Sequence, residues 1–101
     1  FGYPRDGFSF SLKSSTKARD AYYKYVMDAV AENAAHGGLL VACNFWGWGG
    51  YAKPRHERWQ AGDDFTCDPA HEPQGFYSVF ASDKSTLKII QKHTKRMSEI
   101  K

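Results

Sequence analysis

The segment from residue 39 to residue 50 runs from a nearly unbroken apolar stretch into two tryptophans spaced by a single glycine. Apolar residues at consecutive positions are typical of a strand that is covered on both faces, as in parallel sheets flanked by helices. Trp46 and Trp48 then follow at the carboxyl end of this strand, where α/β barrels carry their chemistry. The segment therefore predicts a buried strand of an α/β fold that leads into a site.

Trp46 and Trp48 suit two different roles. Indole rings spaced by a glycine present flat faces to a ligand, and the glycine lets a ligand or another backbone approach closely. Sugar rings, which have apolar C–H faces and polar rims, are natural partners of such surfaces. Burial of both indoles in a core is the alternative, because tryptophan is largely buried on average. The residues alone leave both roles open.

Size and charge limit the classes of protein to which the chain can belong. Its 101 residues form one small domain, and a hydrophobic content of 42% suffices for a modest core. The net charge of +3 is small and its cationic residues form no single stripe, so nucleic acid is not an expected partner. No apolar run has membrane-spanning length, so no membrane partner is expected either. Because the chain begins at Phe1 rather than at Met, we expect an excised piece or a processed product.

The cysteines and histidines predict neither a metal site nor a cofactor. Cys43 and Cys67 are too few for a disulfide framework or a thiolate zinc site, and we expect two free thiols. Metal-ligand spacing is absent among the four histidines, which are His36, His56, His71 and His93.

Helical periodicity appears on both sides of the apolar segment. The first helix is predicted to begin near Ser14 or Ser15, whose hydroxyls can cap its first amides, and to end at residues 36–38. Its expected buried face consists of Ala18, Tyr22, Tyr25, Val26, Ala29 and Val30. A second helix is predicted to begin after Ser82 or Asp83. Its expected buried face consists of Leu87, Ile90, Thr94 and Met97.

Between the apolar segment and the second helix lies a long irregular stretch from about residue 49 to residue 74, followed by a short extended candidate at 76–80. A strand that is apolar on both faces needs neighbours on both edges, and only this one short strand is available. The order helix, buried strand, long loop and closing helix fits the carboxyl-terminal portion of a (β/α)₈ or TIM barrel. We therefore interpret residues 1–101 as a single segment of a larger α/β catalytic domain.

Five blocks of sequence carry a specific resemblance. They are FGYPRD (1–6), NFWGWGG (44–50), WQAGDD (59–64), DPAHEPQG (68–75) and YSVFASDKST (77–86). In this order they resemble the carboxyl-terminal part of family 5 glycoside hydrolases, the endo-β-1,4-mannanases. The resemblance covers nearly the whole chain.

The resemblance implies a secreted or periplasmic TIM-barrel enzyme that cleaves β-1,4-mannan-type polysaccharides and retains anomeric configuration. Such enzymes use a pair of glutamates about 5 Å apart. The family's acid/base glutamate lies in an Asn-Glu-Pro motif, which this sequence lacks. The nucleophile of close relatives stands just before the FGYPRD block, so we expect it immediately upstream of Phe1 and assign no catalytic residue. The chain alone is predicted to be inactive.

The residues that the resemblance carries over are three substrate-binding tryptophans. Trp46 matches the family's platform beneath the sugar at the cleavage site. Trp48 is the second candidate, with packing against the barrel wall as its alternative. Trp59 is expected to contribute to a more distant sugar site. The basic residues near Trp59 are interpreted as a solvated charge cluster; they are Arg55, His56 and Arg58.

Several charged residues have a structural interpretation. Asp63, Asp64 and Asp68 lack the alternation of a calcium loop and are expected to stabilise turns. Glu72 falls in the same kind of hydrogen-bonded turn, within the DPAHEPQG block. Arg5 either fixes a nearby carboxylate or forms an ordinary surface ion pair.

The functional hypothesis is thus part of a retaining endo-β-1,4-mannanase, which supplies aromatic contacts but not the catalytic glutamates. The alternative is a non-catalytic carbohydrate-binding module. The expected partners are a β-mannan or related polysaccharide and, because strand edges and apolar helix faces would be exposed, the remainder of the barrel or a second copy of the chain.

Overall fold

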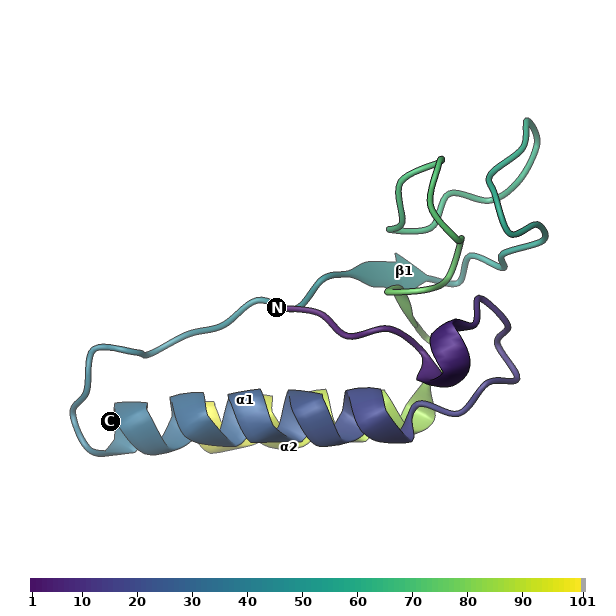
Figure 1. Ribbon diagram of the computed structural model, residues 1–101. Coiled ribbons are helices and arrows are strands. Elements are labelled where there is room, and N and C mark those ends of the chain that lie inside the picture. The colour runs from purple at the N-terminus through teal and green to yellow at the C-terminus, as the bar shows by residue number, and fades with distance from the viewer. Residues whose placement is uncertain (101) are drawn as a thin grey trace.

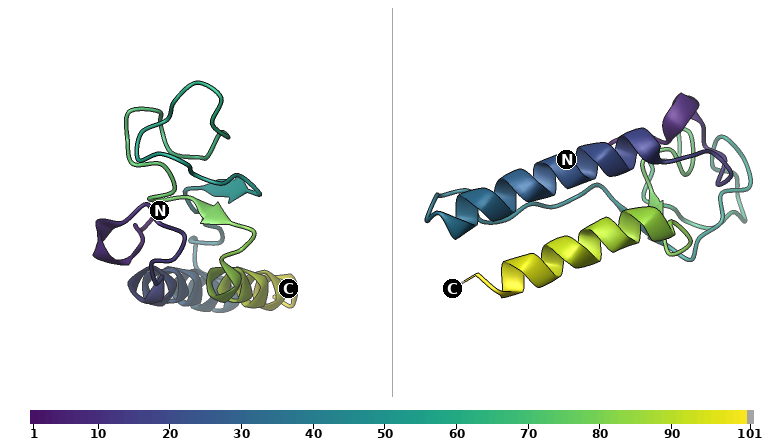
Figure 2. Two further views of the ribbon diagram at one scale, coloured as in Figure 1. Left: turned by 90° about the vertical axis from the view of Figure 1, so that its right-hand side faces the viewer. Right: turned by 90° about the horizontal axis from the view of Figure 1, so that it is seen from below.

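The computed structural model describes residues 1–100, in which helices and irregular segments predominate over short strands (Figure 1). The elements are η1 (Asp6–Phe8), α1 (Lys17–Ala35), β1 (Trp48–Gly50), β2 (Val79–Phe80) and α2 (Lys84–Ser98). Both helices start beside the loops and run in the same direction, side by side (Figure 2). This parallel arrangement is what successive strand–helix units of an α/β fold produce.

The two strands form one parallel pair. Trp48 lies opposite Val79 and Gly50 lies opposite Phe80, with an irregularity between the two positions. The amide of Val79 donates to the carbonyl of Gly47 at 2.9 Å, and the amide of Ala81 donates to that of Gly50 at 2.8 Å. The carboxyl end of β1 leads into the long irregular stretch, whereas β2 is followed by residues 81–83 and then by α2.

The predicted buried strand beginning at Leu39 is wrong for the chain on its own. Residues 39–45 are not assigned to a strand, and the residues at 39–41 are exposed, with Leu39 at 98%. The segment runs back over α1 toward β1 (Figure 1). Its backbone is held near both ends: the Leu40 amide donates to the Asn33 side-chain oxygen, and Phe1 donates its amino group to the Asn44 carbonyl and accepts from the Trp46 amide. Among residues 1–100, no strand lies beside positions 39–43, and the side chains of Leu39, Leu40 and Val41 stay in solvent.

Helix α1 ends as predicted but begins differently. Its first residue is Lys17, and neither Ser14 nor Ser15 caps it. The carboxylate of Asp6 instead accepts the amides of Lys17 at 3.0 Å and Ala18 at 3.1 Å. A negative group at this end also offsets the helix dipole. At the other end Gly37, with φ of 76°, donates to Ala34, and the next amide donates to the Asn33 carbonyl at 2.8 Å.

The buried face of α1 differs from the predicted one. It consists of Arg19, Tyr23, Met27, Val30 and Ala31, so that only Val30 was expected. Tyr25, which was expected to be buried, is 75% exposed. The observed buried face of α1 is shifted by one residue from the predicted one. The reason is that Arg19, a residue type usually found in solvent, is completely buried among polar partners.

A small core joins the helices to β2. Tyr23, Met27 and Val79 form its fully buried part. Partly buried apolar side chains surround it: Phe1, Cys43, Phe45, Leu87, Ile89 and Ile90. Helix α2 begins after Asp83 as predicted, although Thr94 on its expected buried face is exposed. Among the described residues, neither helix is long and apolar enough to cross a bilayer.

Candidate functional site

An open hollow of about 460 Å³ lies where the amino-terminal segment meets the loops after β1. Its residues are Phe1, Gly2, Trp46, Pro69, Glu72 and Tyr77. The indole of Trp46 forms its largest apolar wall and is 54% exposed. A half-exposed indole beside a carboxylate and a phenol offers both a flat apolar face and hydrogen-bonding groups to a ligand.

The backbone of Trp46 is held from two sides. Its amide donates to the Phe1 carbonyl at 2.6 Å, and its carbonyl accepts from the Tyr23 hydroxyl at 3.3 Å. Burial raises the pKa of Tyr23 to about 12, which keeps this phenol protonated and able to donate. The peptide bond to Gly47 is cis. A side chain at Gly2 would lie 3.1 Å from the Trp46 carbonyl, so the absence of one lets the two segments approach.

The loop from Asp68 to Gly75 forms the opposite wall, and two buried side chains determine its shape. The carboxylate of Asp68 accepts from the Gly75 amide at 2.8 Å, the Tyr77 amide at 2.9 Å and the Ser78 hydroxyl at 2.5 Å. The Gln74 side-chain amide donates to the carbonyls of Asp68, Pro69 and Glu72. The predicted turn chemistry of Asp68 is confirmed.

Glu72 and Tyr77 are functional candidates that sequence reasoning did not identify. Glu72 was predicted to lie in a hydrogen-bonded turn, yet only its backbone amide and carbonyl take part, and its side chain lines the hollow at 44% exposure. Tyr77 was counted as part of the extended candidate at 76–80, but the strand covers only Val79 and Phe80. The sequence did contain a signal for Glu72. The loop has two acids, and because Asp68 holds the turn, the Glu72 side chain is free to face solvent.

A buried ionic cluster joins the amino-terminal segment and α1 to the start of α2. Arg5 is 1% exposed and donates to both carboxylate oxygens of Asp83, at 3.0 and 2.6 Å. The guanidinium of Arg19 lies 3.1 Å from the same carboxylate and also donates to the Ser78 carbonyl. Burial pushes the pKa of Asp83 upward, but hydrogen bonds from Arg5 and Phe80 and the two guanidinium charges outweigh it, and the pKa lies below its ordinary value. Of the two predicted roles for Arg5, fixing a carboxylate is confirmed.

The structure separates the three predicted tryptophans. Trp48 lies on β1 and is 53% exposed, but it does not line the Trp46 hollow. Trp59 stacks on Phe65 with ring centroids 5.4 Å apart, and its indole N–H donates to the Asp63 carbonyl at 3.2 Å. These two rings line a different hollow, on the other side of the loop that carries Asp68. A substrate role for Trp48 and Trp59 stays a prediction.

Turn chemistry also explains Asp63. Its carboxylate lies 2.8 Å from Nδ1 of His56 and accepts the Gln60 amide at 3.0 Å. The hydrogen bond from His56 lowers the pKa of Asp63. Arg55 and Arg58 are exposed, in agreement with the predicted solvated cluster.

Both cysteines are free, as expected. Burial raises the pKa of the Cys43 and Cys67 thiols, so both remain neutral near pH 7. Cys67 lies 3.0 Å from the Ser78 hydroxyl. Within residues 1–100, no three His, Cys, Asp or Glu side chains gather as a group able to hold a metal ion.

A parallel pair of strands with parallel helices beside it agrees with part of an α/β barrel. The chain belongs to the GH family 5 beta-mannosidase-like family, whose model matches residues 1–101. The family resemblance of the five sequence blocks is thereby confirmed, and the chain is a partial barrel with only two short strands in its described part.

Solved structures of glycoside hydrolase family 5 mannosidase from Rhizomucor miehei resemble the chain. A glutamate-to-alanine variant is 25% identical with a TM-score of 0.85, and the match covers 99% of this chain and 26% of that one. A second such variant, in complex with mannosyl-fructose, is 25% identical with a TM-score of 0.76 and the same coverage. This chain therefore spans about a quarter of the length of these structures. No curated protein matches it.

Proposed function

We propose that this chain is the carboxyl-terminal part of a retaining glycoside hydrolase that cleaves β-1,4-mannan internally, and that it supplies a sugar-binding wall of the active site. The observation that carries the proposal is the half-exposed Trp46 indole beside an open hollow, in a chain of the family 5 mannosidase-like class. Internal cleavage of the polymer rests on the resemblance of the five sequence blocks to endo-β-1,4-mannanases. Since mannans are extracellular polymers, the same proposal places the enzyme outside the cell.

In this proposal one mannose ring lies with its C–H face on Trp46. The carboxylate of Glu72 then accepts hydrogen bonds from sugar hydroxyls, and Tyr77 contributes a further wall and a hydroxyl. The walls are fixed before the sugar binds, because Asp68 and Gln74 hold the loop and Phe1 holds Trp46. Preorganisation of this kind reduces the entropy cost of binding.

The catalytic carboxylates belong to the rest of the barrel in this proposal. Retaining hydrolysis needs two carboxyl groups about 5 Å apart on either side of the scissile bond. Glu72 is the only glutamate among the residues of the hollow, so the hollow has no such pair of its own. The matched mannosidase structures are about four times as long as the aligned part, which leaves room for both groups elsewhere in the barrel.

A chimaera tests this proposal. This chain replaces the matching 26% of the Rhizomucor miehei mannosidase, and hydrolysis of a β-mannoside and of β-1,4-mannan is measured. Trp46→Ala is expected to lower kcat/KM by about tenfold to a hundredfold, the loss of roughly 1.4–2.8 kcal/mol of aromatic contact. Tyr25→Ala is the control because that ring is exposed on α1 and does not line the hollow. The chimaera should unfold at the same temperature as the parent mannosidase. If both variants then lose kcat/KM equally, the assignment of the sugar contact to Trp46 is contradicted.

The non-catalytic alternative predicts a different result for the chain alone. A carbohydrate-binding module would bind mannohexaose with a saturable change in tryptophan fluorescence. An incomplete active site supplies only one wall and is expected to give no saturable response over the same range.

A further inference from the structure

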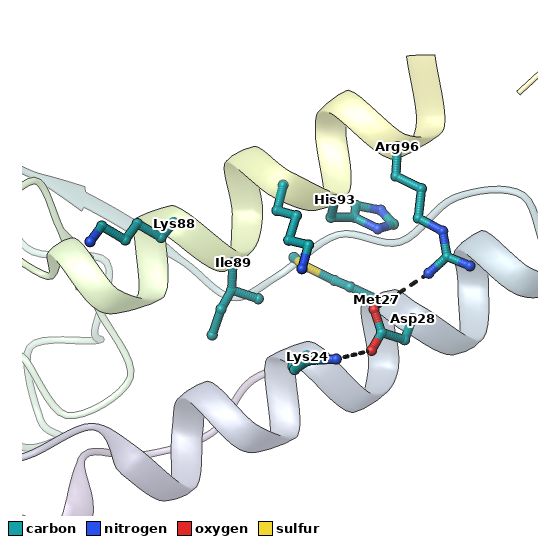
Figure 3. A pocket seen from close by; sticks show the side chains of 8 residues that line it. Lys24, Met27, Asp28, Lys88, Ile89, His93 and Arg96 are labelled. Carbon is teal, nitrogen blue, oxygen red and sulfur yellow. Dashed lines mark hydrogen bonds and ion pairs between the residues drawn. The ribbon is translucent and has the colours of Figure 1, made fainter. Parts of the chain in front are cut away.

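A groove of about 350 Å³ runs between α1 and α2, away from the Trp46 hollow (Figure 3). Met27 from α1 and Ile89 from α2 form its apolar part. Cationic side chains from both helices surround these two residues: Lys24, Lys88, Lys92 and Arg96. The groove thus combines an apolar strip with a positively charged rim.

The positive charge of this groove is not balanced by nearby acids. Helix α2 carries five Lys or Arg residues and no Asp or Glu between Lys84 and Ser98. Asp28 is shared by Lys24 and by Arg96, whose guanidinium lies 3.6 Å away. Within residues 1–100, Lys88 and Lys92 have no ion-pair partner. Like charges four residues apart destabilise a helix, so an anionic ligand would relieve a repulsion that the fold retains.

The cations of α2 also have a regular spacing. Lys88, Lys92 and Arg96 follow one another at intervals of four residues, which places them about 6 Å apart along the helix. In an extended peptide, alternate side chains repeat about every 6.6–6.8 Å. Three alternate carboxylates of an extended chain can therefore lie opposite these three cations.

We propose that the groove between α1 and α2 binds an acidic segment of a partner protein, in extended conformation, with carboxylates at alternate positions and apolar side chains between them. The carboxylates pair with Lys88, Lys92 and Arg96, while an apolar side chain contacts Ile89, which is only partly buried. Clusters of cationic side chains recognise acidic motifs in the same way. The apolar strip favours a peptide over a uniformly charged polysaccharide or a lipid surface.

The test uses a fluorescently labelled peptide, Glu-Leu-Glu-Leu-Glu, and the full chain. Fluorescence anisotropy is expected to show saturable binding that weakens as salt screens the charges. Replacing Lys88→Gln together with Lys92→Gln is expected to raise Kd at least about tenfold. These substitutions remove a repulsion, so the helix should remain folded, which circular dichroism checks. The matched control is Lys13→Gln with Lys53→Gln, two exposed lysines outside the groove, for which Kd should not change.

Other outcomes overturn the proposal. No binding, or an equal loss in the control variant, would mean that the groove does not recognise the peptide. Equal binding of Gln-Leu-Gln-Leu-Gln would remove the role of the carboxylates. Tighter binding of polygalacturonate, or of vesicles rich in phosphatidylserine, at equal negative charge would assign the groove to a polysaccharide or to a membrane surface instead.

Discussion

The two ends of this molecule are stabilised in different ways. Near β2 and the start of α2, Arg5 and Arg19 share one buried carboxylate, and Asp68 holds the neighbouring loop. At the opposite end, Leu39 and the two residues after it lie in solvent. The radius of gyration is 14.9 Å, above the roughly 13 Å of a compact chain of this size. The side chains of a buried polar network satisfy one another, whereas an apolar strand becomes buried only when neighbouring elements cover it.

The largest expected effect comes from removing the shared carboxylate. Asp83→Ala leaves Arg5 and Arg19 buried without their counter-ion and should lower the free energy of unfolding by about 3–5 kcal/mol. Asp28→Ala is the control, because Asp28 also lies between two cations but is 46% exposed. Its cost should not exceed about 1 kcal/mol. Urea denaturation measures both, and similar costs would show that burial does not distinguish the two clusters.

Two apolar residues, one buried and one exposed, test the same contrast between the two ends. Met27 is 3% exposed within the core, and Met27→Ala should cost about 2–5 kcal/mol through lost contacts and a cavity. Leu39→Ala removes a side chain that is 98% exposed and should change stability by no more than about 0.5 kcal/mol. A large loss from Leu39→Ala in dilute, monomeric protein would mean that the segment packs against something in solution.

Acid should weaken the polar end first. The pKa of Asp83 is below its ordinary value of about 3.9, so its stabilising contribution is complete above that pH and is lost as the pH falls through the folded-state pKa. The free energy of unfolding should therefore fall as the pH drops below about 4, and more steeply than in Asp83→Asn. Parallel pH profiles for the two proteins would contradict a lowered pKa.

The apolar end should affect association more than unfolding. Replacing Leu39, Leu40 and Val41 together by serine removes exposed apolar surface, which favours self-association. Sedimentation velocity is expected to show oligomers of the original chain that shift to monomer in the triple variant. Its unfolding free energy as a monomer should stay within about 0.5 kcal/mol. If the original chain is monomeric throughout, the exposed segment is not a site of self-association.

Local signals in the sequence were sufficient for part of this fold. The glycines after residue 36 correctly predicted the end of α1, and Asp83 correctly marked the start of α2. Trp46 is 54% exposed, and its contact with a sugar stays a prediction. Each of these features depends on residues adjacent in the chain.

The features that sequence reasoning missed depend on distant partners. Arg19 is buried only because Ser78, Asp83 and Thr86 meet it from 59 or more residues away. Asp6 replaces the expected serine cap because η1 brings it back to the start of α1. Periodicity reports which residues share a helix face, but it does not report which face finds partners.

The loop beside Trp46 divides its tasks between neighbouring residues. Asp68 and Gln74 point into the protein and fix the backbone, whereas Pro69 and Glu72 border the hollow. Mutations at the second pair can therefore change what the hollow accepts while the scaffold that carries them stays intact. Such a loop gives evolution, or a protein engineer, a surface on which ligand preference can be altered at little risk to folding.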